Sequence, residues 1–73
     1  MVKKIEGLDN NLELVELELY DNKLSKIENI NHLHNLTFLD LAFNVIKEVP
    51  LGCLDGLVNL KKIYLSANKI KVM

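Results

Sequence analysis

Apolar residues recur along the chain in three similar segments. Each segment follows the pattern L-x-x-L-x-L-x-x-N-x-L, with Ile accepted in place of Leu, and the three are Leu14–Leu24, Leu36–Ile46 and Leu60–Ile70. The asparagines of the pattern lie 22 and then 24 residues apart. A pattern that repeats at this interval is typical of proteins built from stacked structural units, each of which contacts only its neighbours.

The centre of each segment predicts a short β-strand. Leu17 and Leu19 are separated by one residue, as are Leu39/Leu41 and Ile63/Leu65. Because side chains on a strand point alternately to opposite faces, these pairs face the interior. We therefore expect an α/β solenoid with a short parallel sheet on its concave face. Apolar residues at intervals of three predict 3₁₀ turns or irregular loops on the convex face.

The chain is expected to form a single segment, residues 1–73, of about three repeats. Its expected divisions are a partial unit 1–13, units 14–35 and 36–59, and a last unit 60–73. Val2, Ile5 and Leu8 continue the register backwards, whereas Asn11 interrupts it, and Leu12 is expected to fill that position after a small shift. Since the first and last units are incomplete, we expect a fragment of a longer array, or self-association through uncapped ends.

The repeated asparagines are expected to form a structural ladder. Asn22, Asn44 and Asn68 each follow a predicted strand within a turn. Their side-chain amides are expected to bond backbone groups of their own and the adjacent unit. Replacing such a buried residue by Ala would leave several backbone groups without partners, at roughly 1–3 kcal/mol each.

Composition excludes several classes of function. The single Cys excludes an internal disulfide framework, and no apolar run approaches the roughly 18 residues that span a bilayer. A net charge of −1 gives no electrostatic reason to bind nucleic acid. Charge is nevertheless uneven, because residues 1–41 carry −4 and residues 42–73 carry +3.

No metal, cofactor or catalytic site is expected. His32 and His34 have no Cys or carboxylate at a matching ligand spacing, so we interpret them as solvated side chains. The two extra residues of the 24-residue unit lie within residues 50–53, and Cys53 in this insertion is expected to be a partly buried, inert thiol. No nucleophile with a matching base, and no pair of carboxylates suited to acid–base chemistry, is found in the sequence.

The strand residues between the leucines are expected to face outward on the concave side. Stacking predicts three rows: Glu16, Phe38 and Lys62; Glu18, Asp40 and Tyr64; Tyr20, Ala42 and Ser66. Three of the four aromatic residues stand in these rows, where they would be exposed. Exposed aromatic side chains in a shallow concavity favour a protein-binding surface. Glu18 and Asp40 would be like charges on adjacent strands, which a basic partner group would relieve.

The repeats resemble the 22-residue leucine-rich repeats of the leucine-rich regulatory subunit of type-1 protein phosphatase. The resemblance rests on the Lys-Ile-Glu box after the turn, in Lys4–Leu8 and Lys26–Ile30, and on Leu39–Asn44 and Leu60–Leu65. It implies a concave face that holds the phosphatase through acidic and aromatic strand residues, and Glu18, Asp40 and Tyr64 match such positions. Val49–Leu57 looks more like the 24-residue units of extracellular leucine-rich proteins.

The resemblance implies a non-enzymatic protein–protein interaction module without cofactors, located in the cytoplasm or nucleus. The implied partner is a protein, in the first instance a phosphatase catalytic subunit. Spliceosomal leucine-rich proteins and axonemal dynein light chains share the Lys-Ile-Glu box. The alternative is therefore a structural segment of such an intracellular protein, with its binding residues elsewhere.

Overall fold

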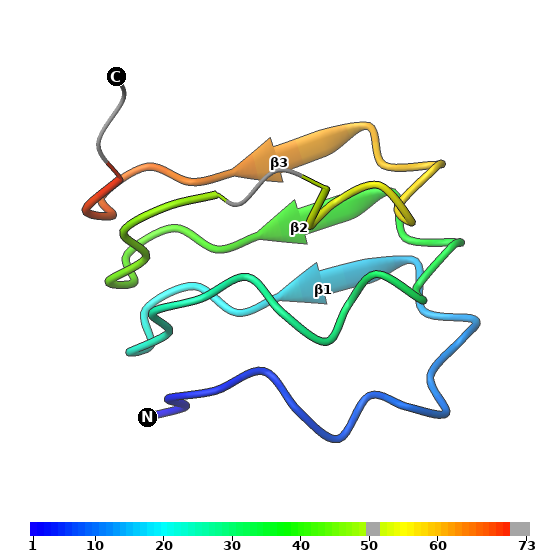
Figure 1. Ribbon diagram of the computed structural model, residues 1–73, viewed down its shortest axis with the longest axis horizontal. Coiled ribbons are helices and arrows are strands. Elements are labelled where there is room, and N and C mark those ends of the chain that lie inside the picture. Colours follow the sequence, from blue (N-terminus) through cyan, green and yellow to red (C-terminus); the bar gives the residue numbers. More distant parts are fainter. Residues whose placement is uncertain (50–51, 71–73) are drawn as a thin grey trace.

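The computed structural model describes residues 1–49 and 52–70 as a stack of coils. Each complete coil contributes one short strand: β1 (Glu16–Glu18), β2 (Phe38–Asp40) and β3 (Lys62–Tyr64). The three strands form one parallel sheet in the order β1-β2-β3. Figure 1 shows them side by side, with residues 1–13 forming a further half-coil next to β1.

The leucines of the repeat form the interior of the stack. Leu39, at the centre of β2, is fully buried, while its neighbours Leu17 and Ile63 on the outer strands are half-buried. The most buried residues come from the first three units, and the apolar residues of the last coil are partly buried against them. The most buried residues are Ile5, Leu24, Ile27, Ile30, Leu33, Leu36, Leu39, Leu41, Ile46 and Leu57. The core is therefore a continuous wall that runs along the stack, as expected for a solenoid.

The side opposite the sheet consists of consecutive tight turns. The Leu33 N–H donates to the Ile30 carbonyl at 3.0 Å, and the Leu36 N–H donates to the Leu33 carbonyl at 3.1 Å. The same pair of bonds recurs at Leu54, Leu57 and Leu60 in the next coil. These bonds join residues three apart, as in a 3₁₀-helix, but the turns do not continue into a helix. The described part of the chain contains no helix, so the helical component of the expected α/β class is absent there.

The half-coil at residues 1–13 differs from expectation. Asn11 keeps the register of the repeat, because its N–H donates to the Leu8 carbonyl at 3.2 Å and its carbonyl accepts from the Leu14 N–H at 3.1 Å. Leu12, which we expected to fill the position of Asn11, is 54% exposed. The expected shift was wrong because backbone hydrogen bonds decide this turn, and Asn satisfies them as well as Leu does.

The ladder asparagines bond backbone groups of two coils. Asn44 is 5% exposed; its Oδ1 accepts from the Leu24 N–H, and its Nδ2 donates to the carbonyls of Leu19, Leu41 and Ala42, all at 3.0–3.2 Å. Asn22 and Asn68 make the corresponding bonds in the outer coils, to Val2 N–H and to Ile46 N–H respectively. The amide thus closes each turn and ties it to the coil before it.

Two positions in each coil adopt left-handed backbone conformations. The residues before the ladder asparagines have φ values of 59°, 58° and 55°: Asp21, Phe43 and Ala67. A second row lies before the convex turns, with φ values of 79°, 59° and 85°: Gly7, Asn29 and Gly52. The insertion expected at residues 50–53 lies partly outside the described residues, since Pro50 and Leu51 are not among them.

Candidate protein-binding face

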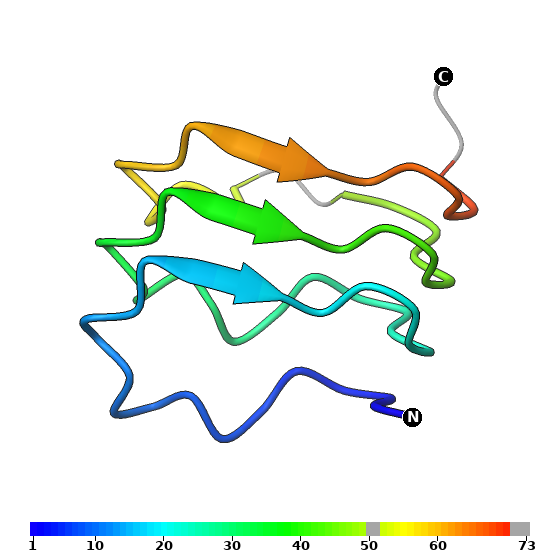
Figure 2. The ribbon, with the colours of Figure 1, turned by 180° about the vertical axis from the view of Figure 1, so that it is seen from behind.

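The concave face presents two rows of side chains set by the strand register. Glu16 lies opposite Phe38, which lies opposite Lys62. Glu18 lies opposite Asp40, which in turn lies opposite Tyr64. Figure 2 shows the strands from this side, with no other segment crossing in front of them.

The rings of Phe38 and Tyr64 form the aromatic centre of this face. Their centroids lie 5.5 Å apart with an interplanar angle of 69°, an edge-to-face arrangement. Tyr64 is 46% exposed. Phe38, which we expected to be exposed, is half-buried because the neighbouring Tyr64 ring covers part of it. Such a pair contributes about 0.5–1.5 kcal/mol beyond the area that it buries. It therefore holds the Tyr64 ring in one orientation on the surface.

The acidic row is less strained than the sequence suggests. The Asp40 side chain is half-buried, and its Oδ1 accepts from the Ala42 N–H at 3.1 Å. A backbone donor partly compensates the negative charge beside Glu18. Glu16 and Glu18 are exposed, as is Lys62 at the far edge of the sheet. The face is thus acidic on β1 and β2 and basic on β3.

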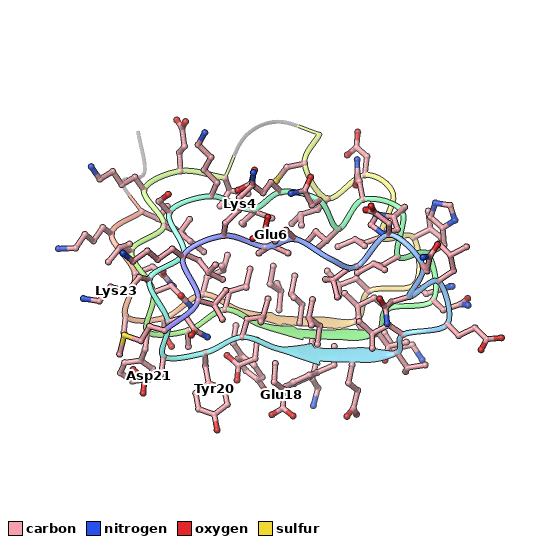
Figure 3. The ribbon with its side chains drawn as sticks, turned by 90° about the horizontal axis from the view of Figure 1, so that it is seen from below. Lys4, Glu6, Glu18, Tyr20, Asp21 and Lys23 are labelled. Atoms are coloured by element: carbon pink, nitrogen blue, oxygen red, sulfur yellow. The ribbon has the colours of Figure 1, made fainter. Side chains whose placement is uncertain are left out.

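The third expected row differs from expectation at its central residue. Ala42, expected to face outward between Tyr20 and Ser66, is 7% exposed. Tyr20 and Ser66 are exposed, so the difference lies in the central position of Ala42, which has a coil on each side and only a methyl side chain. Tyr20 remains 54% exposed, and Figure 3 shows it pointing away from the coil interior on the same side as Glu18.

Phe43 is a further exposed aromatic residue next to this face. Phe43, which we did not include in the binding surface, is 62% exposed and lines a hollow of about 300 Å³ together with Tyr20 and Asp21. The sequence offered one indication of this, since Phe43 directly precedes a ladder asparagine, as Asp21 and Ala67 do. The repeat itself does not require an aromatic ring at that position.

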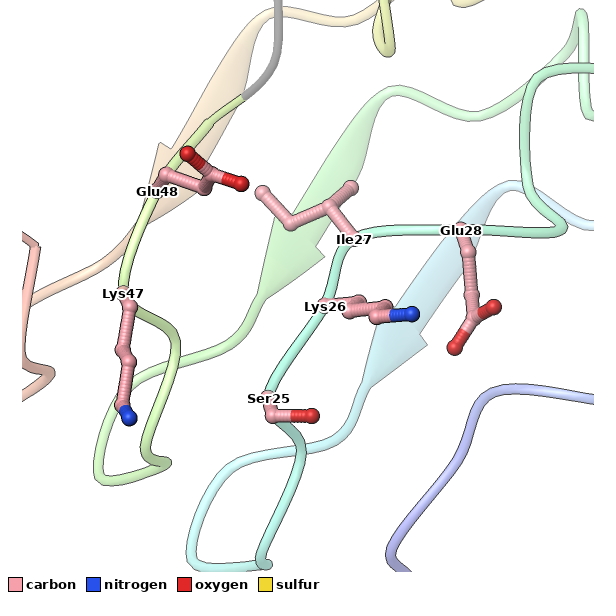
Figure 4. A pocket seen from close by; sticks show the side chains of 6 residues that line it. All are labelled: Ser25, Lys26, Ile27, Glu28, Lys47 and Glu48. Carbon is pink, nitrogen blue, oxygen red and sulfur yellow. The ribbon is translucent and has the colours of Figure 1, made fainter.

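A larger hollow of about 480 Å³ lies elsewhere on the coils. Figure 4 shows its walls, which come from two segments that follow the ladder asparagines: Ser25, Lys26, Ile27, Glu28, Lys47 and Glu48. Two lysines and two glutamates line it, so their formal charges cancel. Nothing in this arrangement favours a particular ligand.

His32 and Cys53, whose side chains could take part in metal or thiol chemistry, are partly buried in the fold. Within residues 1–49 and 52–70, no three His, Cys, Asp or Glu side chains come together as a metal site. The His32 ring is not simply solvated as expected, since its Nε2 lies 2.8 Å from the Leu8 carbonyl and links two coils. Cys53 is half-buried, and burial raises the pKa of its thiol, with a smaller contribution from nearby Asp55.

The described residues include no helix that is long and apolar enough to cross a membrane.

Comparison with known proteins identifies the repeat. Residues 13–70 match the family model "Leucine rich repeat". Human "Volume-regulated anion channel subunit LRRC8A" is 44% identical over 61 residues, 80% of this chain and 7% of that protein. The Arabidopsis thaliana "Protein phosphatase 1 regulatory inhibitor subunit PPP1R7 homolog" is 33% identical over 73 residues, 99% of this chain and 22% of that protein.

A third relative names the same phosphatase. The "Protein phosphatase 1 regulatory subunit SDS22" of Saccharomyces cerevisiae is 43% identical over 49 residues, 66% of this chain and 14% of that protein. The chain thus spans less than a quarter of the length of each of these relatives. The sequence pattern, the stacked coils and the family match agree, and the chain belongs to the leucine-rich repeat family.

Proposed function

We propose that the chain is a non-enzymatic module that binds a protein partner on its concave face. The binding residues in this proposal are those of the strands and the strand ends: Glu16, Glu18, Tyr20, Phe38, Asp40, Lys62 and Tyr64. The observation that carries it is the Phe38–Tyr64 ring pair beside an acidic row, on a surface that no other part of the described chain covers. Oriented aromatic rings next to charged side chains are characteristic of binding hot spots.

The partner we propose is the catalytic subunit of a type-1 protein phosphatase. Two relatives are named as regulatory subunits of that phosphatase, and one of them matches 99% of this chain. The acidic row on β1 and β2 would suit a basic surface on the partner. With this partner goes a location in the cytoplasm or nucleus, which fluorescence microscopy of the tagged protein would test.

Capture of the purified phosphatase catalytic subunit on the immobilised chain tests the proposal. Tyr64→Ala and Asp40→Asn should each weaken capture about tenfold or more, as truncation of a hot-spot residue does. Asp40→Asn keeps an acceptor for the Ala42 N–H, so the turn should be preserved, whereas Asp40→Lys should abolish capture by reversing the charge. The matched controls Val58→Ala and Asp9→Lys change exposed residues away from the sheet and should leave capture unchanged.

The alternative is a structural segment of another leucine-rich repeat protein, of the spliceosomal or axonemal type. It predicts that a longer protein containing this segment binds its partner normally after the concave face is altered. Undiminished capture by both Tyr64→Ala and Asp40→Lys would contradict the concave-face proposal and favour this alternative.

A further inference from the structure

We propose that the hollow lined by Tyr20, Asp21 and Phe43 receives an arginine side chain from a protein partner. The proposal rests on the protein-binding function above and extends the surface from Tyr20 at a strand end to Asp21 and Phe43, where the chemistry is different. The hollow measures about 300 Å³, and its walls come from two adjacent coils.

The first support is that Phe43 has no evident role in the fold. Asp21, Phe43 and Ala67 occupy equivalent positions with φ values of 59°, 58° and 55°. The N–H groups of Asp21 and Phe43 donate to the next coil, to the carbonyls of Ala42 and Ser66, both at 3.0 Å. Since Ala67 adopts the same conformation with only a methyl group, the position does not require a ring.

The second support is that Phe43 is unfavourable for stability in two respects. A bulky residue in the left-handed region is a rare and strained choice. Its ring is also 62% exposed to solvent, so little of its apolar surface is buried in return. Strained and exposed apolar residues concentrate at binding sites, where contact with a partner compensates both costs.

The third support is the arrangement of the aromatic residues. All four aromatic residues of the chain are among the described residues. Of these, Phe38 and Tyr64 contact each other through their rings. Tyr20 and Phe43 border the hollow instead. Two aromatic residues and the carboxylate of Asp21 at one hollow suit a planar cation, which can stack on a ring while it donates to the carboxylate.

The charge around the hollow selects a cation. Asp21 lines it directly, Glu18 lies two residues before Tyr20 on the same side, and Asp40 lies opposite Glu18. One lysine, Lys23, follows two residues after Asp21, which leaves the surroundings acidic. Arginine fits better than lysine because its guanidinium is planar and less strongly hydrated. None of the 73 residues is arginine, so the occupant comes from outside this sequence.

NMR titration with a small probe tests the site directly. N-acetyl-arginine amide added to the isotopically labelled chain should produce saturable shifts at the amides of Asp21 and Phe43. N-acetyl-citrulline amide, which has the same shape without the charge, should not saturate, and the lysine analogue should bind more weakly than arginine. Added salt should weaken arginine binding, because the site is exposed.

Variants separate the two rings and the carboxylate. Phe43→Ala and Asp21→Asn should each weaken arginine binding roughly two- to fivefold, and Tyr20→Ala combined with Phe43→Ala should abolish saturation. Phe43→Ala should fold, because Ala67 already occupies the equivalent position. The matched control Tyr64→Ala removes an exposed ring from the concave face and should leave arginine binding unchanged.

The outcomes distinguish this site from the proposed function. Equal binding of arginine and citrulline, or unchanged binding by the double variant, would overturn the proposal whatever the phosphatase does. Arginine binding that persists in Tyr64→Ala while phosphatase capture is lost would support two separate contacts on one surface.

Discussion

At the scale of single residues, Asn44 makes as many side-chain hydrogen bonds as Asn68 and is the more buried of the two. It receives one backbone N–H and donates to three carbonyls, in a setting where it is 5% exposed. An apolar replacement would leave the Leu24 N–H without its acceptor, whereas each of the three carbonyls would keep one donor, from Asn22, Asn68 or the Asp21 N–H. The side chain therefore acts as a cross-link between coils and not as a feature of one turn.

We predict that Asn44→Ala lowers the free energy of unfolding by about 1–3 kcal/mol, because the buried Leu24 N–H would lose its acceptor and three carbonyls would each lose one of two donors. Asn44→Asp should also be destabilising, since a carboxylate can accept from the Leu24 N–H but cannot donate to the carbonyls. Urea unfolding followed by circular dichroism measures both. Asn10→Ala, at an exposed asparagine, is the control and should change stability by less than about 0.5 kcal/mol.

Cys53 leads to a prediction about pH. Burial raises the pKa of its thiol in the folded state above the unfolded value, so the folded state retains the proton to higher pH. The favourable difference is fully present below the unfolded pKa and is lost as pH rises toward the folded pKa. Under reducing conditions, the stability of the native sequence should therefore fall in the alkaline range relative to that of Cys53→Ala. Parallel curves for the two proteins would contradict this.

At the scale of elements, the convex turns are joined by contacts that the hydrophobic pattern does not contain. Asn31 Oδ1 accepts from the Gly56 N–H at 2.7 Å, and Asn59 Nδ2 donates to the His34 carbonyl at 2.8 Å. Asn29 and Asn35 likewise donate to carbonyls of the coil before them. The abundance of asparagine in this chain thus has a structural use on both edges of the stack.

Gly56 stands where two of these turns come closest. A Cβ placed on Gly56 would overlap the backbone carbonyl of Asn31, which cannot move without disturbing its own turn. We predict that Gly56→Ala destabilises the chain by about 1–3 kcal/mol, the usual cost of inserting an atom into a packed region. Thermal unfolding should show the loss, and Val58→Ala, at a side chain that is 74% exposed, should not. Equal melting temperatures for Gly56→Ala and the native sequence would show that the turns can separate at no cost.

At the scale of the whole molecule, stability should be distributed unevenly along the stack. β2 is hydrogen-bonded on both sides, whereas β1 and β3 each pair with β2 alone within the described residues. Leu39 is accordingly fully buried, and Leu17 at the same position of β1 is half-buried. In a stacked array, each coil is stabilised by the interfaces that it forms with its neighbours.

We predict that Leu39→Ala costs about 3–4 kcal/mol and that Leu17→Ala costs about half as much, because the second cavity would be open to solvent. The two substitutions remove the same atoms from the same repeat position, so each is the control for the other. Denaturant unfolding gives the two free energies. Equal losses would show that the outer coil is as tightly packed as the central one.

The repeat pattern determined much of this architecture without the structure. The positions of the three strands, their register and the interior leucines follow from a period of two within each strand and a period of 22 to 24 between strands. Those two periods are geometric, since they state which way a side chain points and which residue stands beside it. The rows Glu16–Phe38–Lys62 and Glu18–Asp40–Tyr64 therefore follow from counting along the chain.

Only the tertiary structure decided how far each of those side chains is covered. Ala42 is buried because its small side chain lies in the central coil between two others, and Phe38 is half-buried because the Tyr64 ring lies against it. The left-handed conformation of Phe43 and the hollow beside it depend on the closing turn and on the neighbouring coil together. A periodic pattern specifies the direction in which each side chain points. The burial of a side chain and the shape of the surface depend on distances between coils, which the sequence of a single repeat does not specify.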